Sequence, residues 1–298
     1  MHEMNWVITG EQQGMSIQNL LRGQLKISYT QYKRLKFHEG IYVDGMPRRS
    51  DYRLSRGESL KLVFRNDAGP RPLSGSQPLV VAYEDNDLLM VNKPAPLHSI
   101  SSKQGGETLE NRVFSYLGEP ADFVYRPINR LDKGTSGLML VAKNAHIQQR
   151  MQKKLHSQEF LREYLAITVG HLPQSSGRID LPIGHGAGIR RVVDADGQAA
   201  LTFYEVVHTK GDLSLVAIRL ITGRTHQIRV HLGALGCPVY GDFLYGQEEV
   251  QMPGRFALHS CSVKFFHPLL SRWVQASADM PPEMQEIIGP PASWGCMR

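Results

Sequence analysis

The stretch 126–144, RPINRLDKGTSGLMLVAKN, constrains the fold of this chain more than any other part of the sequence. Its second half, 138–142, is an uninterrupted apolar run with the length of a buried strand. Gly134 and Gly137 precede that run, and glycine is favoured where a chain bends sharply or another group approaches closely. A single carboxylate, Asp132, stands just before them. The stretch therefore predicts an acidic side chain held at the start of a core strand.

Taken alone, Asp132 is more simply explained as a turn residue that caps backbone N–H groups. Two distant stretches favour a functional interpretation. The segment R-E-Y-L-A places Tyr164 inside an expected strand, and T-G-R-T-H-Q-I-R-V-H-L places Arg224 at an expected helix start. A helix N-terminus disfavours a cation because the helix dipole is already positive there. Arg224 is therefore expected to have an anion nearby, and Asp132 is the candidate.

Length and composition indicate a globular protein with room for one large domain and one small one. The chain has 298 residues, of which 41% are hydrophobic and 21% charged, so it can bury a sizeable core. Its three cysteines, Cys237, Cys261 and Cys296, form no C-x-x-C pair, which predicts reduced thiols rather than disulfides or a zinc site. The sequence shows no signal-peptide pattern and no apolar run of the ~18 residues a membrane span needs. We expect a cytoplasmic protein without membrane contact.

The first quarter of the chain carries most of the positive charge and predicts a small unit of helices and strands. Residues 1–70 hold 11 Lys and Arg against 7 Asp and Glu, and the whole chain has a net charge of +6. Apolar spacings of three and four predict helices within 14–40, followed by a small sheet with a strand at 59–64. The cations of those helices are Arg22, Lys26, Lys33, Arg34 and Lys36. Arg22 and Lys26, four apart, are expected on one helix face, which is most often simply a solvated surface.

The stretch 66–77, NDAGPRPLSGSQ, is rich in Gly, Pro and Ser and predicts a linker between domains 1–65 and 78–298. Beyond it, patterning predicts strands at 79–83, 87–92, 138–142, 160–169, 200–208, 213–221 and 256–266. Helices are predicted at 108–117, 144–157, 222–235 and 281–288, the first two with Thr108 and Asn144 as N-caps. Short turns join most of the strands, which is typical of an α+β fold with a central mixed, largely antiparallel sheet flanked by helices.

The common cofactor and metal motifs are absent from the sequence. There is no G-x-x-x-x-G-K-[ST] loop, no strand-linked G-x-G-x-x-G, no H-E-x-x-H and no G-x-S-x-G. His226 and His231 are five residues apart, a spacing that does not place them on one helix face as zinc ligands. We expect no cofactor and no metal.

The N-terminal unit resembles the alpha-L-motif RNA-binding domain of the S-four type, named after a ribosomal protein. The pattern runs L-L-x-x-x-L-K-x-S from Leu20, continues with G-I-x-V-D-G from Gly40, and ends with L-x-x-G-E-x-L from Leu54. The resemblance implies that Arg22, Lys26, Lys33, Arg34 and Lys36 contact RNA phosphates. Such contacts give affinity with little sequence choice.

From about residue 79 to 268 the chain resembles the RluA-type pseudouridine synthases. The resemblance rests on N-R-L-D-K-G-T-S-G-L, R-E-Y-L-A and T-G-R-T-H-Q-I-R-V-H-L in the family's order and approximate spacing. A late L-H-S, with F-H-P after it, matches a further family motif. The resemblance implies an isomerase that detaches a uracil from its ribose C1′ and re-attaches it through C5, without cofactor or metal.

The resemblance also implies roles for individual residues. Asp132 matches the catalytic aspartate, and Arg224 matches the arginine that keeps this carboxylate charged. Tyr164 matches the tyrosine that packs against the target base and helps remove the C5 proton. Arg130 matches the arginine that assists base flipping, and Thr135 is expected to line the substrate site. The expected partner is RNA, ribosomal rather than transfer RNA, bound by a monomer.

Two positions depart from the family pattern. Asn129 stands where many members have His, so it can hydrogen-bond but cannot carry a positive charge. The family's K-P-A-G becomes K-P-A-P at 93–96, which alters a loop. A non-catalytic RNA-binding or ribosome-assembly factor remains the alternative, though such a protein has no need of the Asp, Tyr and Arg set. A metal-dependent nucleic-acid hydrolase lacks ligands in the sequence.

Overall fold

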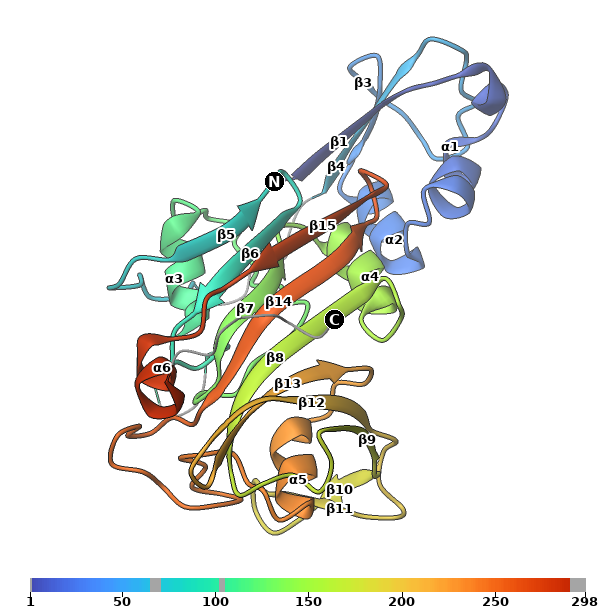
Figure 1. Ribbon diagram of the computed structural model, residues 1–298. Coiled ribbons are helices and arrows are strands. Elements are labelled where there is room, and N and C mark those ends of the chain that lie inside the picture. Colours follow the sequence, from blue (N-terminus) through green and yellow to red (C-terminus); the bar gives the residue numbers. More distant parts are fainter. Residues whose placement is uncertain (1, 65–70, 102–104, 290–298) are drawn as a thin grey trace.

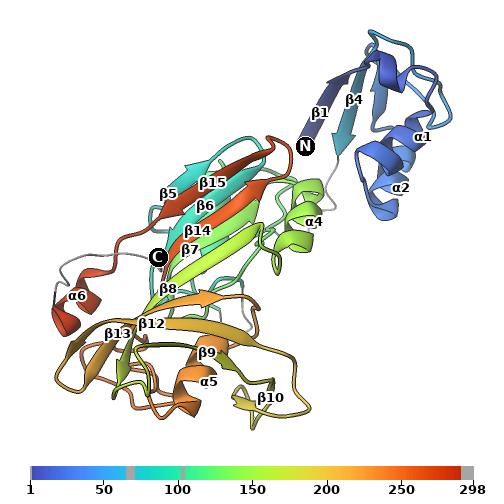
Figure 2. The same cartoon turned by 45° about the vertical axis from the view of Figure 1, so that its right-hand side comes forward.

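The computed structural model describes residues 2–64, 71–101 and 105–289. These residues form a small N-terminal unit and a larger body built around one long sheet, with the unit at one end of that sheet (Figures 1 and 2). The predicted α+β class is confirmed, with a mixed central sheet and helices around it.

The N-terminal unit has a four-stranded antiparallel sheet in the order β1-β4-β2-β3. Its strands are β1 (His2–Val7), β2 (Ile41–Val43), β3 (Met46–Pro47) and β4 (Ser59–Phe64). Its helical segments are η1 (Gly10–Gln12), α1 (Ile17–Asn19), the π-helical turn η2 (Leu20–Gln24) and α2 (Tyr29–Phe37). Sequence patterning predicted the helices and β4 but missed β1. A separate apolar core, including Leu20, Leu21 and Leu60, lies between this sheet and its helices.

The large body contains a nine-stranded sheet in the order β5-β6-β7-β14-β8-β13-β12-β9, with β15 added beside β14. Its strands are β5 (Val80–Glu84), β6 (Leu88–Lys93), β7 (Ser136–Ala142), β8 (Phe160–Val169), β9 (Ser176–Asp180), β12 (Leu201–Lys210), β13 (Leu213–Leu220), β14 (Leu258–His267) and β15 (Arg272–Ser277). Only β7 and β14 run parallel; the other paired strands are antiparallel. A separate hairpin pairs β10 (Ile183–His185) with β11 (Arg191–Val193).

Four helices accompany this sheet: α3 (Leu109–Tyr116), α4 (Ala145–Lys154), α5 (Gln227–Ala234) and α6 (Pro282–Ile288). The predicted caps of two of them are confirmed, because the Thr108 side chain accepts from the first turn of α3 and Asn144 from that of α4. Strands β12 and β13 curve over α5 at the end of the body far from the N-terminal unit (Figure 1). None of the helices in the described part of the chain has the length and apolarity to cross a membrane.

Strand β7 lies in the middle of the body and is buried along its whole length, as the apolar run predicts. Met139 and Val141 face one apolar core, whereas Leu138 and Leu140 face another on the opposite side of the sheet. Because successive strand residues point to opposite faces, both faces of β7 are covered. The start of this strand, just after Asp132, is therefore rigidly placed.

The predicted linker is described only in part, since residues 65–70 lie outside the described residues. Residues 71–77 contain no helix or strand, but they are bound to the α3 region rather than free. The backbone N–H of Gly75 donates to Ser115 Oγ at 2.9 Å, and that of Ser76 donates to a carboxylate oxygen of Glu107 at 2.5 Å. The division into domains 1–65 and 78–298 stays a prediction.

Gly137 allows the close parallel pairing of β7 with β14. Its φ is +108°, and a Cβ at this position would overlap the backbone of Ser260, lying 2.5 Å from its nitrogen. We expect Gly137→Ala to lower the free energy of unfolding by about 3 kcal/mol, because backbone atoms on both sides have no room to move. Urea-induced unfolding measures the change.

Gly211 provides the matched control for that substitution. It also has a positive φ, +55°, but no atom lies within 4 Å of the position that a Cβ would take there. Gly211→Ala should cost only the ~1 kcal/mol of a left-handed backbone. Equal losses at the two glycines would show that backbone conformation, and not the contact with β14, is what Gly137 provides.

Candidate active site

A cavity of about 580 Å³ opens on the sheet where the three predicted motifs converge. The loop before β7 supplies Asp132, β8 supplies Arg162 and Tyr164, and the segment leading into α5 supplies Arg224 and His226. The hydrogen bond that joins Asp132 to Arg229 of α5 spans 97 residues of sequence. A cavity of this size accommodates a ligand as large as a nucleoside.

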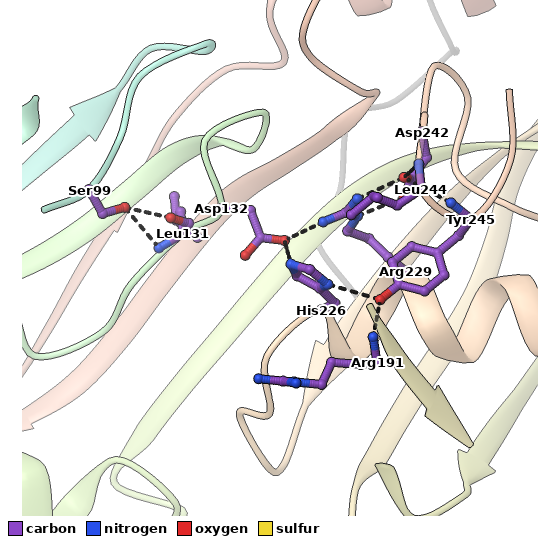
Figure 3. A network of polar contacts seen from close by, with 9 residues as sticks. All are labelled: Ser99, Leu131, Asp132, Arg191, His226, Arg229, Asp242, Leu244 and Tyr245. Atoms are coloured by element: carbon purple, nitrogen blue, oxygen red, sulfur yellow. Dashed lines mark hydrogen bonds and ion pairs between the residues drawn. The ribbon is translucent and has the colours of Figure 1, made fainter. Parts of the chain in front are cut away.

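Backbone and side-chain hydrogen bonds fix the loop that carries Asp132. The N–H of Thr135 donates to the carbonyl oxygen of Asp132 at 3.1 Å, which closes the turn into β7. Ser99 Oγ donates to the carbonyl oxygen of Leu131 at 2.5 Å and accepts from the N–H of the same residue at 3.3 Å (Figure 3). The carboxylate, 29% exposed, thus enters the cavity from a loop secured on both sides.

Arg229 on α5 holds the Asp132 carboxylate. Its Nη1 donates to Asp132 Oδ2 at 2.9 Å, while Nε and Nη2 donate to the two oxygens of Asp242 at 2.6 and 2.7 Å (Figure 3). The guanidinium is buried and lies over the rings of Tyr245 and Phe256. Burial opposes its charge, but hydrogen bonds and charge from Asp242 and Asp132 leave the pKa of Arg229 raised. Asp132 therefore faces a guanidinium that is locked in place.

The expected pairing of Arg224 with Asp132 is wrong. Arg224 lines the same cavity, but its Nε donates to the carbonyl oxygen of Ala199 at 3.0 Å. The physical reason is helix register: α5 begins at Gln227, so Arg224 precedes the helix and Arg229 projects from its first turn. Sequence reasoning missed Arg229, although a cation within a buried helix needs an anionic partner.

His226 is a second residue that sequence patterning did not assign to this site. It has a left-handed backbone, φ +59°, at the start of α5, and its Nε2 lies 3.8 Å from Asp132 Oδ2. Its Nδ1 lies 2.9 Å from the hydroxyl of Tyr245, which itself accepts from the N–H of Arg191 at 2.8 Å. The hydroxyl hydrogen is therefore free to bond Nδ1. Burial lowers the pKa of His226, so the arrangement fits a neutral ring with its N–H toward Asp132.

Tyr164 lies in the floor of the cavity, on the face of β8 that points toward Asp132. Its side chain is buried, and burial raises the pKa of its phenol, while the charge of Arg162 acts in the opposite direction. The ring therefore presents a neutral aromatic surface to the cavity. Such a surface suits stacking against a planar base.

The remaining predicted residues of the cavity differ in exposure. Arg130 is exposed at the rim and Thr135 is buried in the lining. Asn129 now has a structural explanation, because its Oδ1 accepts from the backbone N–H of Leu140 in β7 at 2.8 Å. This bond requires an acceptor and no positive charge.

Lys93, the first residue of the altered K-P-A-P loop, is fully buried behind Asp132. Its Nζ donates to the carbonyl oxygens of Leu97 at 2.8 Å and Pro94 at 3.1 Å, and lies 3.4 Å from that of Lys133. Burial lowers the pKa of Lys93 to about 7, although the charge of Asp132 opposes this shift. The lysine thus ties its own loop to the residue that follows Asp132.

Among the described residues, one group of side chains has the spacing of a metal site, namely Asp85, Asp87 and His267. Most of its donor atoms already have hydrogen-bond partners within the protein. His267 Nδ1 accepts from two backbone N–H groups, and Asp85 accepts from Tyr83 and from two more. His267 Nε2 lies 3.1 Å from Asp85 Oδ2. The group is therefore a hydrogen-bond network that takes no part in the lining of the cavity.

The five predicted phosphate-contacting cations of the N-terminal unit are all exposed. Arg22 and Lys33 lie close to Tyr29, with 5.8 and 4.8 Å to its ring centroid. The expectation that Arg22 and Lys26 share a helix face is wrong, because η2 ends at Gln24 and Lys26 has a left-handed backbone, φ +54°.

Comparisons with known proteins identify the family of this chain. A family model described as RNA pseudouridylate synthase matches residues 87–234. The uncharacterized RNA pseudouridine synthase YjbO of Bacillus subtilis (strain 168) is 34% identical over 272 residues, 89% of this chain and 96% of that protein. The ribosomal large subunit pseudouridine synthase D of Yersinia pestis is 35% identical over 71% of this chain and 70% of its own length. The solved structure of human RNA pseudouridylate synthase domain containing 1 has a TM-score of 0.58 at 25% identity and covers 72% of this chain and 89% of that one.

Proposed function

Because this chain belongs to the RNA pseudouridylate synthase family and is thus an isomerase acting on RNA, we propose that Asp132 performs the reaction on a uridine of ribosomal RNA. This proposal rests on the position of the Asp132 carboxylate. It accepts a hydrogen bond from Arg229 at 2.9 Å and lies in a cavity that Tyr164 also lines. No other carboxylate lines that cavity among the described residues.

The reaction needs a nucleophile, a fixed counter-charge and a surface for the base. Asp132 assists cleavage of the bond between ribose C1′ and uracil N1, which splits a difficult isomerisation into two easier steps. The base turns within the cavity, C5 bonds to C1′, the C5 proton leaves and N1 gains one, so no redox partner is required. Tyr164 stacks on the base, and its phenol, kept neutral by burial, can assist loss of the C5 proton only as a relay that gives up its own proton.

Access to the cavity requires the target nucleotide to leave its helix. A uracil stacked inside a duplex cannot reach a carboxylate at the bottom of a cavity, so it must be extruded. Arg130 lies exposed at the rim, where a guanidinium can take the place of the displaced base. Thr135, close behind Asp132, closes the wall against which the base comes to rest.

Ribosomal RNA is the proposed substrate class for two reasons. Relatives that match more than two thirds of this chain are named as ribosomal large subunit pseudouridine synthases. The five predicted phosphate-contacting cations of the N-terminal unit are also all exposed, which suits a large structured polyanion.

The direct test uses unmodified ribosomal RNA transcribed with [5-³H]uridine. Each isomerisation releases the C5 hydrogen, so tritium should appear in solvent in proportion to enzyme turnover. Release from transfer RNA transcripts alone would overturn the ribosomal assignment. Release from neither RNA, by protein shown to be folded, would overturn the assignment of catalysis to Asp132.

Neutralising the cations of the N-terminal unit should weaken RNA binding without abolishing turnover. Replacing Lys33, Arg34 and Lys36 with Gln should lower the slope of log Kd against log salt concentration by about one for each phosphate that is no longer neutralised. Filter binding with a ribosomal RNA transcript over a series of KCl concentrations measures the slope. A matched variant changes the exposed cations Arg178, Arg190 and Lys210 in the large body. An equal drop in that variant would mean that net charge alone, and not the N-terminal unit, governs affinity.

A further inference from the structure

Arg162 is a buried guanidinium that the protein itself leaves largely unpaired. Its side chain is 4% exposed, yet its only hydrogen bonds among the described residues are long contacts from Nη2 to the carbonyl oxygens of Leu155 at 3.4 Å and Thr222 at 3.3 Å. Within the same described part of the chain, Nε is buried without a partner and Nη1 makes no hydrogen bond. Burying an unpaired charge is costly, so this arrangement calls for a ligand.

The surroundings of Arg162 are basic. No carboxylate of the described residues forms an ion pair with it, and the acidic neighbour in sequence, Glu163, points to the other face of β8 and pairs with Arg219. The nearby titratable groups are His156, Arg224 and Tyr164, and burial followed by the charges of both arginines lowers the pKa of His156. The part of the cavity around Arg162 is therefore positively charged.

The segment leading into α5 leaves space around this guanidinium. A Cβ at Gly223 would lie 2.8 Å from Arg162 Nη1 and 3.4 Å from the His156 ring. The glycine in T-G-R-T thus keeps open the side of Arg162 that faces the cavity lining. Gly223 matters here because it lacks a side chain, and its backbone flexibility plays no part.

We propose that Arg162 binds a phosphodiester group of the nucleotide that enters the cavity, with Arg224 reinforcing the charge from the rim. A guanidinium forms charge-assisted hydrogen bonds with phosphate oxygens, and Nη1 of Arg162 makes no hydrogen bond within the described part of the chain. Arg162 and Tyr164 are two residues apart on the same face of β8. A phosphate at Arg162 therefore places the attached nucleotide beside Tyr164. This inference rests on the proposed reaction at Asp132.

The test compares Arg162→Met with Arg162→Lys and the wild-type enzyme. The probe is the [5-³H]uridine-labelled ribosomal RNA transcript, used for both turnover and filter binding over a range of KCl concentrations. We expect Arg162→Met to raise KM and Kd by about tenfold to a hundredfold, as for loss of one charge-assisted bond. The salt slope should fall by about one, and Arg162→Lys should restore part of the affinity. The melting temperature should stay the same or rise, since a buried unpaired charge is removed.

Arg126→Met is the matched control, because Arg126 is also a buried arginine but does not line the cavity. It should leave the salt slope unchanged. A lower melting temperature of Arg162→Met with an unchanged slope would overturn the proposal in favour of a structural role. A loss of kcat alone, with KM and slope unchanged, would also overturn it and assign Arg162 to the chemistry at Tyr164. If the wild-type enzyme releases no tritium, the function at Asp132 fails, while the salt slopes still decide the role of Arg162.

Discussion

Asp132→Asn is expected to abolish pseudouridine formation, with a loss of at least about a thousandfold in kcat, while the protein folds normally. The amide has nearly the shape of the carboxylate but is a far weaker nucleophile, and removal of a reacting group commonly costs this much or more. Tritium release from labelled ribosomal RNA under single-turnover conditions measures the chemical step directly.

The fold should tolerate this substitution because Asp132 is not a main support of the structure. Its carboxylate is 29% exposed, and Arg229 keeps both hydrogen bonds to Asp242 when Asp132 changes. RNA affinity should therefore remain within a few-fold of wild type. Turnover by Asp132→Asn at a rate near wild type would contradict the mechanism, whereas a marked fall in affinity would reveal a binding role for the carboxylate.

Strand β7 and the position of Asp132 before it could be predicted from the sequence for a simple reason. A run of apolar residues as long as 138–142 can only be buried, and the glycines before it mark close approaches that the structure confirms at Gly137. The N-caps Thr108 and Asn144 could be predicted equally well, because an N-cap side chain accepts a hydrogen bond from a backbone N–H only three residues later. Sequence patterns therefore predict those features that depend on residues close together in the chain.

The sequence alone could not identify the partner of Asp132. Arg224 and Arg229 lie in one motif, and the choice between them depends on where α5 starts and on Asp242, which lies on a later loop. The edge strands β1 and β15 were missed for a related reason. Each is an edge strand held by pairing with one neighbour, β4 or β14, which is distant in sequence. The partner of Asp132 and the edge strands both depend on contacts between segments that are distant in the sequence.

Replacing Arg229 is expected to damage both stability and catalysis. Arg229→Met removes the cation that pairs with Asp242, a carboxylate with no exposed surface, and leaves that charge buried alone. Loss of one member of a buried pair costs about 3–5 kcal/mol. The same change frees the Asp132 carboxylate, and loss of a preorganised charge partner should lower kcat about a hundredfold. Urea unfolding and single-turnover tritium release measure the two effects.

The double variant Arg229→Met/Asp242→Asn separates these two roles. Removal of both buried charges should restore most of the lost stability, and the Asn oxygen can still accept from the backbone N–H groups of Leu244 and Tyr245. Catalysis should not return, because Asp132 still lacks its guanidinium. If activity recovers together with stability, Arg229 serves the site only by keeping the protein folded. If stability recovers and activity does not, the guanidinium acts on the Asp132 carboxylate itself, and Asp242 serves to hold that guanidinium in position.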